Sequence, residues 1–100
     1  MSDSQPLILI VTSARFPLGN LVATPGALES IPNSEIQAAL NRHIVGDWGN
    51  LDPHDVRVNE SALAHGGRLF SAYTSAQGER FYIITEADSS ATTILLPEEY

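Results

Sequence analysis

Hydrophobic residues follow three patterns along the chain, and each pattern predicts a different kind of element. Continuous apolar runs at 7–12 (LILIVT) and 21–23 predict strands, because apolar and β-branched residues favour extended backbone. From about residue 34 to residue 65, apolar residues recur every three to four positions, which is typical of helices packed by one face. From Arg68 to Leu96 apolar and polar residues alternate, which predicts strands with one buried face.

Cap and turn residues set the boundaries of these elements. Thr24-Pro25 and Asp52-Pro53 each place a capping side chain before a proline, which predicts two helix starts. A further helix between them is expected to end at Gly46. Residues 75–78 and 87–90 are rich in turn formers, so the last three predicted strands are expected to form a meander.

Together these elements predict the α+β class. We expect an antiparallel sheet of three to five strands, made of a C-terminal three-stranded meander plus an N-terminal strand, with two to three helices packed on one face. Residues 1–6 are polar and are expected to be disordered, which leaves a single domain over residues 7–100. An unpaired strand at the edge of such a sheet invites another chain, so a homodimer stays open.

Charge is sparse but strongly unbalanced. The 100-residue chain has twelve acidic residues and five arginines, for a net charge of −7. This charge disfavours direct binding to nucleic acid or to an anionic membrane, and it favours a protein partner with a basic surface. The longest apolar run is too short for a membrane span and lacks the features of a secretory signal, so we expect a cytoplasmic protein.

The residue types restrict the chemistry. The chain has neither cysteine nor lysine, which excludes disulfides, zinc–thiolate sites, thiol nucleophiles and Schiff-base chemistry. The three histidines, at 43, 54 and 65, are too widely spaced for one metal ion on a helix, and His43 is expected to pack in the core. We therefore predict no catalytic residue, cofactor or metal site. A small metal-dependent hydrolase using aspartate and histidine remains a second alternative, because such side chains can converge in a fold.

Binding residues are sought instead at the lone tryptophan, at a hairpin tip and at the C-terminal end. Trp48 has two interpretations: an indole that closes the core, which is favoured because tryptophan is usually buried, or an aromatic anchor for a partner. Loop tips and chain ends carry many binding residues. The candidate partner-binding residues are Asp47, Trp48, Glu86, Asp88, Ser89, Glu98, Glu99 and Tyr100.

From residue 18 onward the chain resembles a family of small proteins carried by plasmids, phages and integrative elements of proteobacteria. The segments that carry the resemblance are LVATPGALE at 21–29, RHIVGDWGNLD at 42–52 and ITEADSSATTILLPEEY at 84–100. Family members are often labelled plasmid-related proteins or subunits of a type I restriction methyltransferase. Asp52-Pro53-His54 is not the catalytic motif of such a methyltransferase, and Ser89 stands where the family commonly has arginine.

The resemblance implies an accessory protein of a mobile element. Proteins in this setting include inhibitors of restriction and CRISPR systems, which occupy the basic nucleic-acid-binding surfaces of defence complexes. We therefore expect a non-catalytic protein that binds a host protein or a defence complex. The alternative is an accessory protein for maintenance or transfer of the element, acting through a partner that the element encodes.

Overall fold

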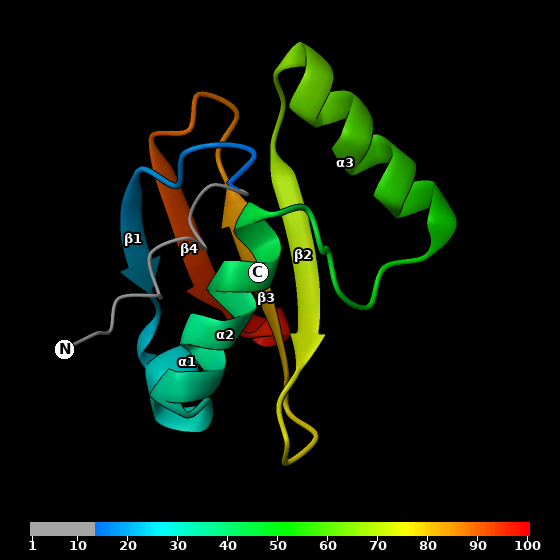
Figure 1. Cartoon of the computed structure of the whole chain (residues 1–100). Helices are drawn as coiled ribbons and strands as arrows, with labels where there is room; N and C mark the ends of the chain where they lie inside the picture. Colours follow the sequence, from blue (N-terminus) through cyan, green and yellow to red (C-terminus); the bar gives the residue numbers. More distant parts are fainter. Residues whose placement is uncertain (1–13) are drawn as a thin grey trace, which may run out of the picture.

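The computed structural model describes residues 14–100, so the strand expected at 7–12 and the disorder expected at 1–6 lie outside the described residues. Residues 14–100 form an α+β fold, as predicted, with helices in the middle of the chain and most strands near its end (Figure 1). The elements are β1 (Asn20–Ala23), α1 (Pro25–Ser30), α2 (Asn33–Ile44), α3 (Pro53–His65), β2 (Leu69–Thr74), β3 (Arg80–Thr85), β4 (Ala91–Leu95) and a 3-10 helix, η2 (Pro97–Glu99).

Four strands form one mixed sheet in the order β1-β4-β3-β2. The last three strands make the predicted antiparallel meander. β1, however, runs parallel to β4, with Asn20 opposite Ala91 and Ala23 opposite Ile94. The expectation of a purely antiparallel sheet is therefore wrong. β1 and β4 are separated by three helices and two strands, so no hairpin turn fixes their relative direction.

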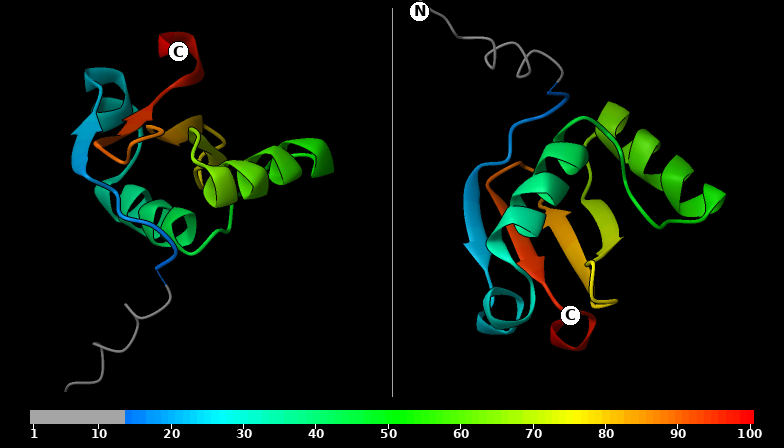
Figure 2. Two further views of the ribbon diagram at one scale, coloured as in Figure 1. Left: turned by 90° about the horizontal axis from the view of Figure 1, so that it is seen from above. Right: turned by 60° about the horizontal axis from the view of Figure 1, so that its bottom comes forward.

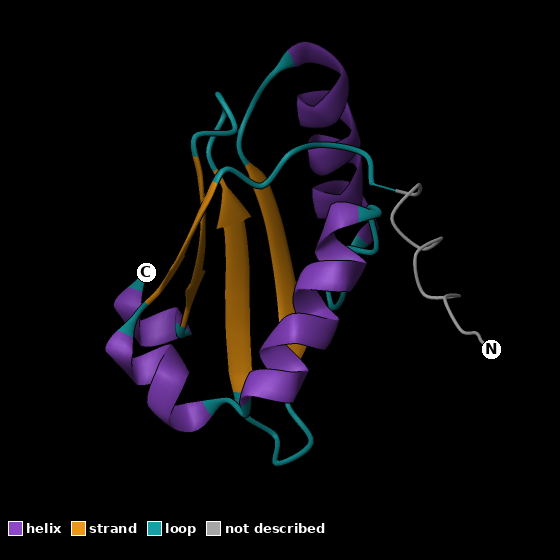
Figure 3. Cartoon of the chain, turned by 60° about the vertical axis from the view of Figure 1, so that its left-hand side comes forward, coloured by secondary structure: helices purple, strands orange, loops and turns teal. Residues whose placement is uncertain are grey.

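The helices do not all share one face of the sheet, as the sequence led us to expect. Figure 3 shows α2 packed on one face, with α1 and η2 together on the other side near the end of β4. Apolar residues of α2 and of the inner strand positions form the main core beneath α2, joined by Ala27 of α1 and by Ile31 and Leu96 from the adjoining segments. Its buried members are Ala27, Ile31, Ile36, Ala39, Leu40, Tyr73, Phe81, Ile83, Ile94 and Leu96.

α3 lies beside the edge strand β2 and pairs with its backbone through one side chain. Asn59 is the buried residue of this helix. Its Nδ2 donates to the Phe70 carbonyl at 2.6 Å, and the Phe70 N–H donates to Asn59 Oδ1 at 3.1 Å. The amide thus satisfies both outward-facing backbone groups of Phe70, as a neighbouring strand would do.

The loop after α2 occupies the next position along the same edge. The Asn50 N–H donates to the Ala72 carbonyl at 2.7 Å, and the Ala72 N–H donates to the Trp48 carbonyl at 3.2 Å. Gly49 makes this approach possible, because a Cβ there would lie 2.1 Å from the Ala72 carbonyl oxygen. The edge of β2 is therefore closed to another chain at Phe70 and Ala72.

At the opposite edge of the sheet, no strand formed by residues 14–100 pairs with the outer side of β1. Within residues 14–100, β1 pairs only with β4. Its Leu21 and Val22 are 56% and 47% exposed. A homodimer formed by pairing of strand edges, which the sequence leaves open, would use β1, a strand of only four residues.

Replacing Asn59 by alanine should destabilise the fold, because it leaves the N–H and C=O of Phe70 without partners at a partly buried edge. We expect the free energy of unfolding to fall by about 2–3 kcal/mol. Urea denaturation followed by Trp48 fluorescence measures the change. Asn41→Ala, on the exposed surface of α2, is the matched control and should change stability by less than about 0.5 kcal/mol. Equal effects of the two substitutions would show that the Asn59 amide does not hold the edge.

Candidate functional site

A chain of polar side chains crosses the core beneath α2, with His43 at its centre. The imidazole is fully buried, as the sequence predicted. Its Nδ1 lies 2.6 Å from Ser71 Oγ and its Nε2 lies 2.9 Å from Thr85 Oγ1. Thr85 Oγ1 lies 2.7 Å from Thr92 Oγ1, and the Thr92 hydroxyl donates to the Leu18 carbonyl at 2.7 Å. This row of hydrogen-bonded side chains therefore links α2 to β2, β3, β4 and the segment before β1.

The direction of these hydrogen bonds fixes the proton on His43. Because Thr92 donates to a carbonyl, its oxygen accepts from Thr85, and Thr85 in turn accepts from Nε2 of His43. Nδ1 is then free to accept from Ser71. Burial lowers the pKa of His43 to about 4, so the ring is neutral at pH 7. Fully buried, it presents no surface to a substrate and acts as a structural link.

Trp48 closes the core above His43. The indole is only 3% exposed and stacks on Phe16, with ring centroids 6.1 Å apart and planes inclined by 21°. The indole also meets the His43 imidazole edge to face, with ring centroids 5.6 Å apart. Nε1 donates to Glu60 at 3.0 Å. The core interpretation is confirmed, and the alternative of an exposed aromatic anchor is wrong, because the ring lies beneath the surface.

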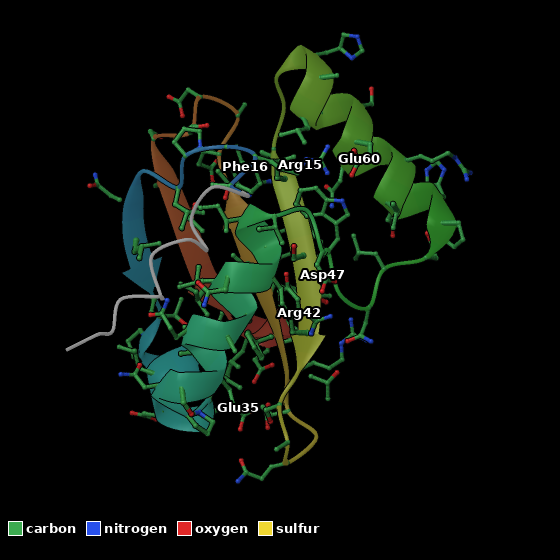
Figure 4. The ribbon with its side chains drawn as sticks, in the orientation of Figure 1. Arg15, Phe16, Glu35, Arg42, Asp47 and Glu60 are labelled. Carbon is green, nitrogen blue, oxygen red and sulfur yellow. The ribbon has the colours of Figure 1, made fainter. Side chains whose placement is uncertain are left out.

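Two arginines near Trp48 form ion pairs with acidic side chains, and Figure 4 labels both pairs. Arg42 donates to both carboxylate oxygens of Asp47, at 2.8 and 3.1 Å, and lies 4.9 Å from the centre of the Tyr73 ring. The pKa of Asp47 is lowered by this hydrogen-bonded guanidinium. Arg15 pairs with Glu60 at 2.9 Å. Asp47 is thus exposed but already neutralised within the chain.

The turn between β3 and β4 is stabilised by its own side chains. Asp88 accepts from the Ser90 N–H at 3.0 Å, as expected for a turn aspartate, and hydrogen bonds from Ser90 lower the pKa of Asp88. Ser89 adopts a left-handed conformation with φ of 59°. Glu86 lies 3.5 Å from Arg68. Of the two acidic candidates in this turn, Glu86 is paired with Arg68, whereas Asp88 forms no ion pair among residues 14–100.

The C-terminal candidates divide into one residue with a structural role and two exposed ones. Glu99 accepts from the Thr24 hydroxyl at 2.5 Å and from the Leu96 N–H at 2.8 Å, and the Thr24 hydrogen bond lowers its pKa. This carboxylate therefore fastens η2 to the start of α1 while keeping its charge. Glu98 and Tyr100 remain exposed.

The topology brings five glutamates together at one end of the sheet. β1, β4 and β2 all end there, because β1 is parallel to β4 and the meander reverses twice. α1, η2 and the turn at 75–79 follow these strands directly (Figure 2, right). The start of α2 joins them, since the Ala76 N–H donates to Glu35 at 2.8 Å. We call this group the acidic end: Glu29, Glu35, Glu79, Glu98 and Glu99.

The ion pairs of the described chain include no glutamate of the acidic end. Arg15, Arg42 and Arg68 pair with Glu60, Asp47 and Glu86, although Arg42 lines one pocket with Glu35. Arg80, at the start of β3, is a second basic residue near this end. Five carboxylates and two guanidinium groups leave a net negative charge at this end of the fold. The sequence pattern indicated only Glu98 and Glu99, because Glu29, Glu35 and Glu79 come near them through contacts between elements that are far apart in the sequence.

Metal and membrane sites were also sought among residues 14–100. In that part of the chain no three histidine, aspartate or glutamate side chains converge on a point where a metal ion could bind. None of the helices formed by these residues has the length and apolar composition needed to cross a bilayer.

No protein-family model, curated protein or solved structure matches this chain.

Lowering the pH from 7 to 5 should destabilise the protein through His43. The pKa of His43 is near 6.5 in the unfolded protein, whereas burial in the folded protein lowers this pKa to about 4. Stability is then complete above pH 6.5 and falls as the pH drops, by about 2 kcal/mol at pH 5. Urea denaturation at both pH values measures this loss.

His43→Gln serves as the control for the pH effect, because it removes the titrating ring. The variant should lose little stability between pH 7 and 5. NMR titration of the three histidines gives a second measurement that needs no variant. A His43 ring that titrates near pH 6.5 in the folded protein would contradict the buried, neutral assignment.

Proposed function

We propose that this protein is a non-catalytic accessory protein that binds a basic surface of a protein partner through its acidic end. Five glutamates lie at one end of the fold, and among residues 14–100 none of them forms an ion pair with an arginine: Glu29, Glu35, Glu79, Glu98 and Glu99. Five carboxylates at one end of the fold give that surface a negative potential. A partner that brings positive charge is attracted to this surface at long range.

The remaining parts of the site support binding rather than chemistry. His43 is buried and neutral, and Asp47, Glu60 and Glu86 are engaged by arginines. The acids of the acidic end lie on exposed helix, turn and 3-10 segments, where a partner can reach them. A preformed carboxylate surface of this kind suits recognition of lysine- and arginine-rich regions, such as those that hold nucleic acid.

The resemblance to mobile-element proteins suggests the setting in which such a partner is met. A cytoplasmic restriction or CRISPR complex presents a basic surface to nucleic acid, and an acidic protein that covers this surface would inhibit the complex. A replication or transfer protein of the element offers similar chemistry. In both settings the partner surface is basic. The identity of the partner would distinguish an inhibitor of a defence complex from a protein that helps to maintain or transfer the element.

Affinity purification of the tagged chain from its host, followed by mass spectrometry, identifies the partner. We expect a stoichiometric protein whose nucleic-acid-binding surface is basic. A defence subunit favours the inhibitor, whereas a replication or transfer protein of the element favours the maintenance alternative. If the co-purifying protein has no basic surface, or if none co-purifies, the proposal is wrong.

A charge-matched pair of variants tests whether the acidic end makes the contact. Glu29→Gln, Glu79→Gln and Glu98→Gln together remove three charges from the acidic end, at exposed positions. This variant should bind the captured partner at least about tenfold more weakly, mainly through slower association. Biolayer interferometry at two salt concentrations measures both rates.

The control variant changes the net charge equally at a distance from the acidic end. Ala14→Lys, Ala64→Lys and Ala87→Lys together add three positive charges at exposed positions of the N-terminal segment, α3 and the β3–β4 turn. This variant should keep most of the affinity. If both variants lose affinity equally, net charge and not the acidic end governs binding.

A further inference from the structure

A second surface feature lies between α3 and the C-terminal residue. It is a groove of about 290 Å³ lined by Leu51, Asp55, Val58, Asn59, Phe70 and Tyr100. In the view from above, α3 and the C-terminal segment extend from the sheet in different directions (Figure 2, left). The lining residues come from the loop before α3, from α3, from β2 and from the C-terminal residue, and Tyr100 directly follows Glu98 and Glu99 of the acidic end.

The walls of the groove are aliphatic and aromatic. Val58 and Tyr100 are 51% and 67% exposed, and Tyr100 is the exposed ring among the aromatic side chains of residues 14–100, whose other rings are buried wholly or in part. The rings of Phe70 and Tyr100 meet nearly edge to face, with centroids 6.0 Å apart and planes inclined by 70°. Leu51 adds a further apolar contact.

The polar groups of the groove leave one charged group for a ligand. Asn59 uses both its Oδ1 and its Nδ2 on the backbone of Phe70, so its amide is already satisfied. Asp55 is exposed in the first turn of α3, and among residues 14–100 it forms no ion pair. A ligand of this groove would therefore meet two aromatic rings, two aliphatic side chains and one carboxylate.

The same combination occurs once elsewhere in this protein, and an arginine fills it there: Arg42 lies 4.9 Å from the centre of the Tyr73 ring and pairs with Asp47. At the groove itself, Arg68 lies 6.0 Å from the centre of the Tyr100 ring, but its ion-pair partner is Glu86, at 3.5 Å, and not Asp55. In the groove the aromatic rings and the carboxylate are present, but no lysine or arginine is among its lining residues.

We propose that this groove receives an arginine side chain of the protein partner. The guanidinium would stack on the aromatic wall and pair with Asp55, while its methylene groups pack on Leu51 and Val58. A purely apolar occupant would remove water from Asp55 without compensation. A second copy of this chain is opposed by its charge of −7. The inference rests on the proposed function, because it names one side chain of the same basic partner.

NMR titration with short capped peptides tests the groove without the partner. The probes are acetyl-Gly-Arg-Gly-amide and the same peptide with citrulline, a neutral isostere of arginine. We expect the arginine peptide to shift the amide signals of Asp55, Val58, Phe70 and Tyr100, with a dissociation constant of about 1–10 mM. The citrulline peptide should bind at least about threefold more weakly, because it lacks the charge that the carboxylate and the rings recognise.

Two variants separate the groove from the overall charge. Asp55→Asn should weaken binding of the arginine peptide about threefold, whereas Glu79→Gln, which removes the same charge from the acidic end, should leave it unchanged. Tyr100→Leu keeps an apolar wall but removes the aromatic ring, and it should also weaken binding. Equal binding of the arginine and citrulline peptides, or shifts confined to the acidic end, would overturn the proposal. So would signals of the groove that move with protein concentration alone, since they would indicate self-association.

The groove and the proposed function can fail separately. If the arginine peptide binds the groove but the acidic-end variants do not affect partner capture, the proposed function is wrong and the groove stands. If partner capture depends on the acidic end but no peptide signal moves in the groove, only the arginine pocket is wrong.

Discussion

The structure depends on the buried hydrogen-bond chain that runs through His43. A histidine, a serine and two threonines in the interior would each cost free energy if left without partners. Here every one is satisfied by the next, and the chain ends on the Leu18 carbonyl. This arrangement fixes how α2 sits on β2, β3 and β4. Phe16 and Trp48 then pack against the imidazole, which positions the segment before β1 and the loop that follows α2.

The loop fixed by Trp48 covers one edge of the sheet. Its backbone at 48–50 forms hydrogen bonds with β2, and Asn59 of α3 covers the next part of the same strand. One edge is thereby closed, and the parallel pairing of β1 forms the other. The same pairing places α1 beside η2, where Glu99 joins them. The order and direction of the strands therefore determine which glutamates gather at the acidic end.

Local features of the sequence predicted the elements well, because their causes are local. Thr24 and Asp52 cap α1 and α3 through the N–H groups of Ala27 and Asp55, at 3.1 and 2.9 Å. Alternation predicted the meander, and helical spacing placed His43 in the core. In contrast, the direction of β1 and the strand-like role of Asn59 depend on residues far apart in the sequence, so no pattern of spacing reveals them. The acidic end was only half predicted for the same reason: Glu98 and Glu99 are adjacent, but Glu29, Glu35 and Glu79 join them only in the fold.

Zero-length carbodiimide cross-linking of the complex with the captured partner shows which carboxylates of this chain contact the partner. The reagent joins carboxylates to amines, and this chain has no lysine, so each bond between this chain and a lysine of the partner marks a carboxylate at the contact. We expect mass spectrometry to find these bonds at Glu29, Glu79 and Glu98, joined to lysines of the partner's basic surface. Bonds concentrated instead at Asp52 and Asp88, with the acidic end unmodified, would contradict this expectation.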